Sequence, residues 1–356
     1  MPGSARPTSP SGLDIRDVAA AAGVSTATVS RALNRPESVR PVLREKVLAA
    51  VQALGYVAHA GARNLKLGRS GTVGVIVPTL DNAIFARGLQ AFQRRMAAAG
   101  RHVLLACSDY DPDQESDQAT NLVARGADAL ALTGLSQKPA LIERLVQRGL
   151  PFVHCGSFPA PPGQACAGLR NREAVAKAVR YLVDLGHRRI GMLAGLTAHN
   201  DRAAERLAGV REALAQAGLR LDPSRVREAA YELQPARDAA RGLLTAAQPP
   251  TALLCGNDVL AWGVLLEARA LGVTVPAQLS VVGFDDLDLS QHWEPALTTI
   301  HAPTERMWTL GAEYLIARLD GSLGEPLQQE LQVELVVRDS TAPPPGRRAS
   351  ATRTGA

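Results

Sequence analysis

A short stretch of the sequence, GVSTATVSRALN, carries residue types that could bind a nucleic acid. At 100° per residue, a helix over this stretch gathers a valine, an alanine and a leucine on one flank. The opposite flank carries Ala27, Ser30 and Arg31, with Thr26 at its boundary near the N-terminus. The apolar flank must be buried, so the polar flank is left for a partner.

These exposed groups match the chemistry of the DNA major groove. Arg31 can donate two hydrogen bonds to a guanine, and the methyl groups of Thr26 and Ala27 can contact thymine. The hydroxyls of Thr28 and Ser30 are better suited to phosphate oxygens. The alternative is an ordinary helical hairpin with a polar face.

The residues before this stretch predict the element that would position it. Asp14 can cap a preceding helix, and Asp17 lies in the opening turn of that helix. Gly23 then supplies a tight turn, and Ser25 caps the second helix. This arrangement is typical of a helix-turn-helix, in which the N-terminal residues of the second helix reach base edges.

A third helix is predicted from Pro41 to Leu54. Its periodicity predicts four inward-facing side chains, those of Val42, Val47, Val51 and Leu54. Three helices in roughly 45 residues make a minimal all-α headpiece.

Charge is unevenly distributed along the 356 residues. Residues 1–69 hold 10 Lys/Arg against 4 Asp/Glu, whereas residues 70–341 hold 26 against 30. The last 15 residues add three arginines and no acid. A basic N-terminal unit on an acidic body indicates a polyanionic partner, with a merely solvated basic surface as the alternative.

The remaining composition excludes several classes of protein. No early segment resembles a signal peptide and no apolar run is long enough for a membrane span, so the sequence predicts a cytoplasmic protein. The four cysteines lack metal-ligand spacing and are expected to be free thiols without a metal. No P-loop, H-E-x-x-H or nucleophile elbow is present, so we expect neither an enzyme nor a cofactor.

From Thr72 onward, apolar runs alternate with amphipathic segments. TVGVIVP, HVLLACS, ADALALTG and PFVHCG are typical of buried parallel strands, and the scheme repeats with TALLCGND and SVVGFDD. Two doubly wound α/β lobes explain this better than one long sheet. The later runs LTTIHAP and LQVELVVRDS would let the chain cross back between lobes, and a ligand would bind in the cleft between them.

Two of these strands end in polar pairs that could contact such a ligand, Asn257–Asp258 and Asp285–Asp286. For Asp258 and Asp286, capping of the following helix is the better interpretation.

The residues quoted so far carry a resemblance. GVSTATVSRALN, with DVA before it and LREKVLAAVQALGY after it, resembles the headpiece of the lactose-repressor/galactose-repressor (LacI/GalR) family, and the similarity runs from about residue 13 to 341. LNRPESVRPVLREK, SDYDPDQES and APTERM are weakly similar to its gluconate-repressor branch. The resemblance implies a periplasmic-binding-protein-like body and a dimeric, sequence-specific transcriptional regulator, most often a repressor. Its partners would be palindromic operator DNA and a sugar or sugar-acid effector. The alternative is a soluble binding protein without DNA readout.

The resemblance also implies the domain boundaries. A flexible tail would span residues 1–12, the headpiece 13–57, a hinge 58–69, the effector-binding and dimerisation domain 70–341, and a disordered basic tail 342–356. In the hinge, Leu65 would insert into the minor groove, and Arg63 and Lys66 would neutralise phosphates. A plain linker is the alternative.

Ligand contacts follow from the resemblance residue by residue. Arg206, in RLAG, matches a ligand-binding arginine; Asn257 and Asp285 match polyol-binding positions; Tyr231 matches a stacking aromatic. The opposite wall would hold Phe85 and Thr133.

Two departures from the family pattern concern the charge of the ligand. Gly156 replaces a frequent aspartate, and Arg170 replaces a frequently acidic residue. An acid lost and a base gained favour an anionic ligand, with Arg170 as a further contact. The alternative is that Arg170 points to solvent.

Overall fold

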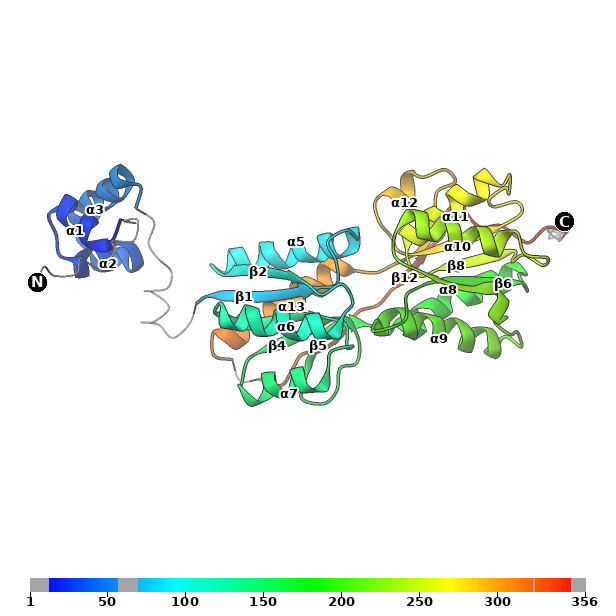
Figure 1. The fold of residues 1–356 in the computed structure, drawn as a ribbon, viewed down its shortest axis with the longest axis horizontal. Helices are drawn as coiled ribbons and strands as arrows, with labels where there is room; N and C mark the ends of the chain where they lie inside the picture. Colours follow the sequence, from blue (N-terminus) through cyan, green and yellow to red (C-terminus); the bar gives the residue numbers. More distant parts are fainter. Residues whose placement is uncertain (1–12, 57–69, 323, 347–356) are drawn as a thin grey trace, which may run out of the picture. The chain divides into compact units, whose positions relative to one another are not determined.

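The computed structural model describes residues 13–56, 70–322 and 324–346. The chain divides into two compact units, residues 1–70 and 71–356, which are described separately (Figure 1). The predicted hinge, with Arg63, Leu65 and Lys66, lies outside the described residues, as do the first 12 and the last 10.

Residues 13–56 of the N-terminal unit form three α-helices, as predicted. They are α1 (Ile15–Ala22), α2 (Thr26–Asn34) and α3 (Pro41–Leu54), with a 3-10 turn at Pro36–Ser38. Their shared core consists of small and β-branched side chains, those of Val18, Ala19, Val29, Ala32, Val47 and Ala50.

The predicted caps of the headpiece are confirmed. The Asp14 side chain accepts from the Asp17 backbone N–H, and the Asp17 side chain accepts from the Asp14 N–H over 2.7 Å. Gly23 ends α1 with φ 64°, a conformation that glycine adopts without steric cost. The Ser25 hydroxyl caps α2 by accepting from Thr28 N over 3.2 Å.

The prediction that Val42 faces the core of the headpiece is wrong. Val42 is 64% exposed, whereas Val47 is fully buried. Five residues separate them, which corresponds to about 140° around the helix, so Val42 lies on the far side.

The first lobe of the body is a six-stranded parallel sheet in the order β11-β5-β4-β3-β1-β2. Its strands are β1 (Thr72–Val77), β2 (His102–Cys107), β3 (Ala127–Thr133), β4 (Phe152–Ser157), β5 (Ala165–Leu169) and β11 (Gln328–Glu330). Its helices are α5 (Ala83–Ala98), α6 (Pro112–Ala124), α7 (Pro139–Gln147) and α13 (Thr304–Leu319). The hydrophobicity pattern missed β5, because ACAGL consists mostly of small residues.

The second lobe has the order β12-β10-β9-β8-β6-β7, parallel except where β12 meets β10. Its strands are β6 (Ile190–Gly195), β7 (Val226–Ala229), β8 (Ala252–Cys255), β9 (Ser280–Asp285), β10 (Thr298–His301) and β12 (Glu334–Val336). Its helices are α8 (Asn171–Leu185), α9 (Asp201–Gln216), α10 (Leu233–Leu244), α11 (Asp258–Ala270) and α12 (Leu289–His292), with a 3-10 turn at Pro223–Arg225.

The chain crosses between the lobes three times (Figure 1). The crossings follow β5, β10 and β11, so LTTIHAP and LQVELVVRDS do return the chain as predicted. The crossings after β5 and β10 start at the carboxyl ends of these strands, so the carboxyl ends of the two sheets face a common space.

The described chain continues beyond the predicted end of the body. The carbonyl of Ala342 contacts His187 Nε2 at 2.9 Å, and the Ser280 hydroxyl donates to it over 3.0 Å. Ala342 is therefore held by the second lobe.

Candidate functional site

The exposed surface of α2 is the first candidate site. Val29 and Ala32 are buried in the headpiece core, while Thr26, Ala27 and Arg31 are exposed. Arg31 Nε donates to the Ala27 carbonyl over 3.3 Å, so the arginine lies along the same flank as Ala27. This flank offers a guanidinium and two methyl-bearing side chains to a partner.

The two predicted phosphate contacts are less exposed. Thr28 and Ser30 are both partly buried. The Thr28 hydroxyl shares a 3.0 Å hydrogen bond with the capping Ser25 hydroxyl. At the start of α2, hydroxyls and backbone N–H groups therefore lie close together, which suits an anionic oxygen.

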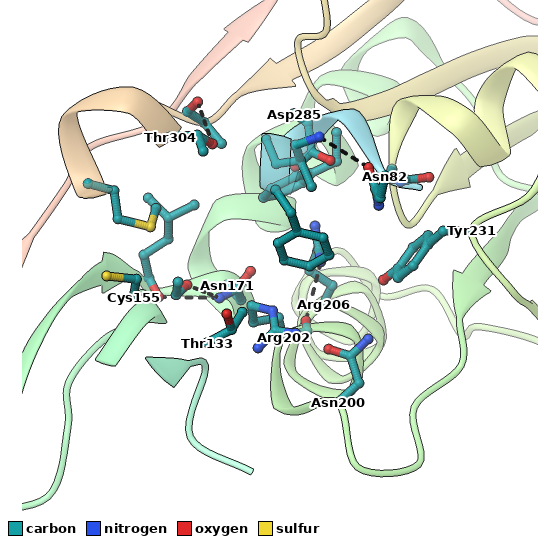
Figure 2. Close-up of a pocket in the computed structure, with 18 of the residues that line it drawn as sticks. Asn82, Thr133, Cys155, Asn171, Asn200, Arg202, Arg206, Tyr231, Asp285 and Thr304 are labelled. Atoms are coloured by element: carbon teal, nitrogen blue, oxygen red, sulfur yellow. Dashed lines mark hydrogen bonds between the residues drawn. The ribbon is translucent and has the colours of Figure 1, made fainter. Parts of the chain in front are cut away.

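The second candidate site is a cavity at the strand ends of the two lobes, lined by residues of both (Figure 2). Six of the seven predicted ligand contacts line it: Phe85, Thr133, Arg206, Tyr231, Asn257 and Asp285.

Arg170 does not line the cavity, and its predicted role is corrected here. Its Nε lies 2.9 Å from a carboxylate oxygen of Glu330, and its guanidinium lies 4.8 Å from the centre of the Phe158 ring. The carboxylate of Glu330 on β11 and the ring of Phe158, directly after β4, therefore hold the side chain.

Asn257 combines a structural contact with a free donor. Its side-chain oxygen caps α11 by accepting from Leu260 N over 2.9 Å. Its Nδ2 is buried with no hydrogen-bond partner among the described residues. Such a group costs about 1–3 kcal/mol unless a ligand supplies an acceptor.

Asp258 and Asp286 are structural, although neither is the predicted helix cap. The Asp258 carboxylate accepts from Leu287 N at 2.7 Å, from Ser290 at 2.8 Å and from Thr299 at 2.5 Å. Asp286 forms an ion pair with Arg338 at 2.7 Å and contacts His301 Nδ1 at 3.0 Å. Asn257 takes the capping role after β8, since its side chain reaches forward to Leu260 N in the first turn of α11.

Asp285 is a buried carboxyl group with an unusual backbone. Its φ is 109°, in a region that non-glycine residues rarely adopt. Burial raises the pKa of Asp285 to about 8, although the nearby Arg206 lowers it, because a charged carboxylate is poorly solvated there. Around neutral pH this group is therefore mostly a protonated hydrogen-bond donor.

Two tyrosines from different lobes meet beside the cavity. The ring centroids of Tyr110 and Tyr231 lie 6.4 Å apart, and both rings line it. Both hydroxyls are buried without a hydrogen-bond partner in the described part of the chain. Burial, and next the neighbouring Tyr231, raises the pKa of Tyr110, so its hydroxyl is available as a donor.

A set of hydrogen bonds around Asp201, which we term the interlobe latch, joins the lobes. The hydroxyls of Ser136 and Ser157, after β3 and in β4, donate to the Asp201 carboxylate at the start of α9. Arg202 Nη1 binds the same carboxylate over 3.1 Å. Burial alone would raise the pKa of Asp201, but Arg202 and the serine hydroxyls hold it below its ordinary value.

Comparison with known proteins identifies this architecture. A family model described as bacterial regulatory proteins of the lacI family matches residues 14–59, and one described as a periplasmic binding protein-like domain matches residues 179–341. The HTH-type transcriptional repressor CytR of Escherichia coli (strain K12) is 34% identical over 333 residues, covering 92% of this chain and 96% of the relative. The chain belongs to the lacI family. The HTH-type transcriptional repressor PurR of Photobacterium profundum is 31% identical, over 92% of this chain and 98% of that relative.

Solved structures of lacI-family proteins share the fold. The lac repressor dimer bound to operator and the anti-inducer ONPF has a TM-score of 0.80 at 27% identity, covering 93% of this chain and all of that one. The transcriptional regulator CelR in complex with cellobiose has a TM-score of 0.68 at 30% identity, covering 94% and 100%.

Membership of the lacI family decides the broad function. The chain is a DNA-binding transcriptional regulator with a ligand-binding body, and it is not an enzyme. Among the described residues, no helix could cross a membrane and no group of three acidic, histidine or cysteine side chains could hold a metal ion.

Sequence reasoning missed several polar residues of this lacI-family cavity. Asn82 caps α5 and Asn200 caps α9, each at a helix that begins beside the cavity. Asn171 donates to the carbonyls of Gly156 and Leu169. An asparagine at the start of a helix that follows a strand was the available signal, and Asn257 was the one such position that we predicted.

Proposed function

We propose that this regulator represses transcription as a homodimer on an operator of approximate two-fold symmetry, and that a small polyhydroxylated effector in the cavity alters its affinity for that operator. The relatives CytR and PurR are transcriptional repressors. A two-fold dimer presents two α2 helices to two half-sites, so the operator should repeat that symmetry. Acting on DNA also implies a cytoplasmic location.

One observation above all supports the effector. Three polar atoms, Tyr110 OH, Tyr231 OH and Asn257 Nδ2, are buried at the cavity without partners among the described residues. A ligand with several hydroxyl groups would satisfy all three, because each hydroxyl both donates and accepts. The cellobiose bound to CelR agrees with a carbohydrate-derived molecule.

On the DNA side, we propose that Thr26, Ala27 and Arg31 contact bases, and that Thr28 and Ser30 contact phosphates. In the hinge, Arg63 and Lys66 would bind phosphates and Leu65 would enter the minor groove. Both segments would contribute to a salt-dependent affinity.

The effector would couple to DNA through the lobes. Because the cavity is lined from both lobes, a ligand stabilises one arrangement of the lobes over another. A difference of about 1–3 kcal/mol would change operator affinity by roughly 5- to 150-fold, and operator DNA would change effector affinity by the same factor.

Selection of random duplex DNA by the purified full chain tests the first half of the proposal. We expect an approximate palindrome to be enriched, and polyhydroxylated compounds to shift the affinity for it. Selection without a consensus, in the presence and absence of such compounds, would favour a binding protein that does not recognise DNA sequence.

A further inference from the structure

Resting on the effector cavity proposed above, we propose that the effector is an anion, and that Arg202 is the residue that selects it. The anionic group is a carboxylate or a phosphate on a polyhydroxylated molecule. Sequence reasoning assigned the selecting base to Arg170, which lies elsewhere.

Arg202 enters the cavity because two glycines leave room for it. An ideal Cβ built on Gly134 would lie 1.9 Å from Arg202 Nη1, and one on Gly156 would lie 3.0 Å from Arg202 Cδ. Both glycines follow or lie in strands of the first lobe, while Arg202 belongs to the second. The guanidinium therefore occupies the space that side chains at these two positions would fill.

A second arginine lies one turn along the same helix. Arg206 is 93% buried, its Nε donates to the Arg202 carbonyl over 3.2 Å, and its guanidinium lies 4.3 Å from the centre of the Phe284 ring. Figure 2 shows both arginines on the α9 side of the cavity. No carboxylate lies within ion-pair distance of Arg206 in the parts of the chain that the structure describes.

Positive charge at the cavity exceeds negative charge. Its described lining contains two arginines and one carboxyl group, that of Asp285. Burial raises the pKa of Asp285 to about 8, which leaves this group mostly neutral near pH 7. Asp201 pairs with Arg202, but it is not among the lining residues and its oxygens also receive the Ser136 and Ser157 hydroxyls.

Arg202 keeps donors free for a ligand. A guanidinium has five N–H donors in a planar fork that fits two oxygens of a carboxylate or phosphate. Its hydrogen bond to Asp201 uses Nη1. The neutral lining groups, from Tyr110, Tyr231, Asn82 and Asn257, would then face the hydroxyls of the same ligand.

Calorimetric titration of the full chain at pH 7 with matched compounds tests this inference. The pairs are D-gluconate against D-glucitol, D-glucuronate against D-glucose, and D-glucose 6-phosphate against D-glucose. We expect at least one acid to bind ten-fold or more tightly than its neutral partner, and the acid that does so distinguishes a carboxylate from a phosphate.

Three variants assign the preference to Arg202. Arg202→Gln should weaken binding of the acid by about ten-fold or more, because a charge-assisted hydrogen bond is lost. The affinity for the neutral partner should stay nearly unchanged. Arg202→Lys keeps the charge but lacks the planar fork, so its affinity for the acid should lie between those of the parent and of Arg202→Gln. Arg170→Gln removes the same charge outside the cavity and should change neither affinity. Tryptophan fluorescence establishes that each variant is folded.

Equal binding of acid and neutral partner, or an acid preference that survives in Arg202→Gln, overturns the inference and leaves the proposed effector cavity intact. Binding of no compound in either series overturns both.

Discussion

The surface of α2 and the cavity of the body both present polar groups to a partner, but under opposite physical conditions. Thr26, Ala27 and Arg31 are exposed to water before any partner binds. Tyr110, Tyr231 and Asn257 hold polar atoms that are already withdrawn from water and unpaired among the described residues. Water can satisfy the exposed groups of the headpiece until a partner binds, whereas a hydrogen bond from a ligand offsets the desolvation of the buried, unpaired groups of the cavity.

The largest effect that we expect concerns the interlobe latch. Asp201→Ala should lower the free energy of unfolding of the body by about 3 kcal/mol, because it leaves the buried Arg202 unpaired and removes the acceptor of two serine hydroxyls. Urea titration followed by tryptophan fluorescence measures this, since all three tryptophans (Trp262, Trp293 and Trp308) lie in the body. Asp117→Ala, at an exposed position of α6, is the control. An unchanged unfolding midpoint would show that the latch does not stabilise the body.

The next effect is pH-dependent and belongs to Asp285. Its folded pKa is raised to about 8, so the stability linked to it is present at acid pH and is lost as pH rises toward that value. Asp285→Asn should therefore gain stability over the parent between pH 6 and 8, by on the order of 2 kcal/mol. Thermal unfolding of both proteins at several pH values gives the difference, from which histidine titrations common to both cancel.

The same variant tests how the charge of Asp285 affects ligand binding. Ionisation of Asp285 above pH 8 places a negative charge beside Arg206, Arg202, Arg87 and Asp258, and an anionic ligand should bind more weakly there. In Asp285→Asn that decline should vanish. A stability difference independent of pH would mean that Asp285 is ionised throughout.

In the headpiece, removal of the Arg31 side chain should weaken DNA binding and leave effector binding unchanged. Arg31→Ala should weaken binding to the selected operator by roughly 10- to 100-fold and relax the sequence preference at one base pair, while effector affinity stays the same. Fluorescence anisotropy with labelled operator measures this. Arg211→Ala, an exposed arginine of α9, is the control for charge. Equal weakening of all DNA sequences would instead assign Arg31 to a phosphate.

The smallest effect tests the cavity directly. Tyr231→Phe removes a buried hydroxyl without a partner in the described structure, so the empty protein should be as stable as the parent or more stable by up to about 1 kcal/mol. Effector affinity should fall several-fold. A loss of stability without a loss of affinity would mean that the hydroxyl has a structural partner.

The headpiece was predictable because its determinants are local. Asp14, Ser25 and Gly23 act on backbone groups within a few residues, and α3 begins and ends where the sequence indicates. The prediction for Val42 was wrong because an apolar residue in the first turn of a helix does not show which side of that helix packs against the core.

The cavity was predictable in part. The alternation of apolar runs and amphipathic segments predicts two α/β lobes, and the resemblance placed six residues that do line the cavity. Arg170 and Arg202 show which part of the cavity was not predictable. Both are arginines near strand ends, and no local pattern tells which of them turns toward Glu330 and which passes Gly134 and Gly156.

Helix caps, hydrophobic periods and the helix-turn-helix spacing depend on neighbours along the chain, so the helices, the strands and the class of protein are predictable from the amino-acid sequence. The charge of the cavity, its unpaired donors and the interlobe latch are not, because they depend on how the chain folds. Those properties arise where residues 133–157 meet residues 201–206 and 257–285, and contacts between such distant segments depend on the shape of both lobes.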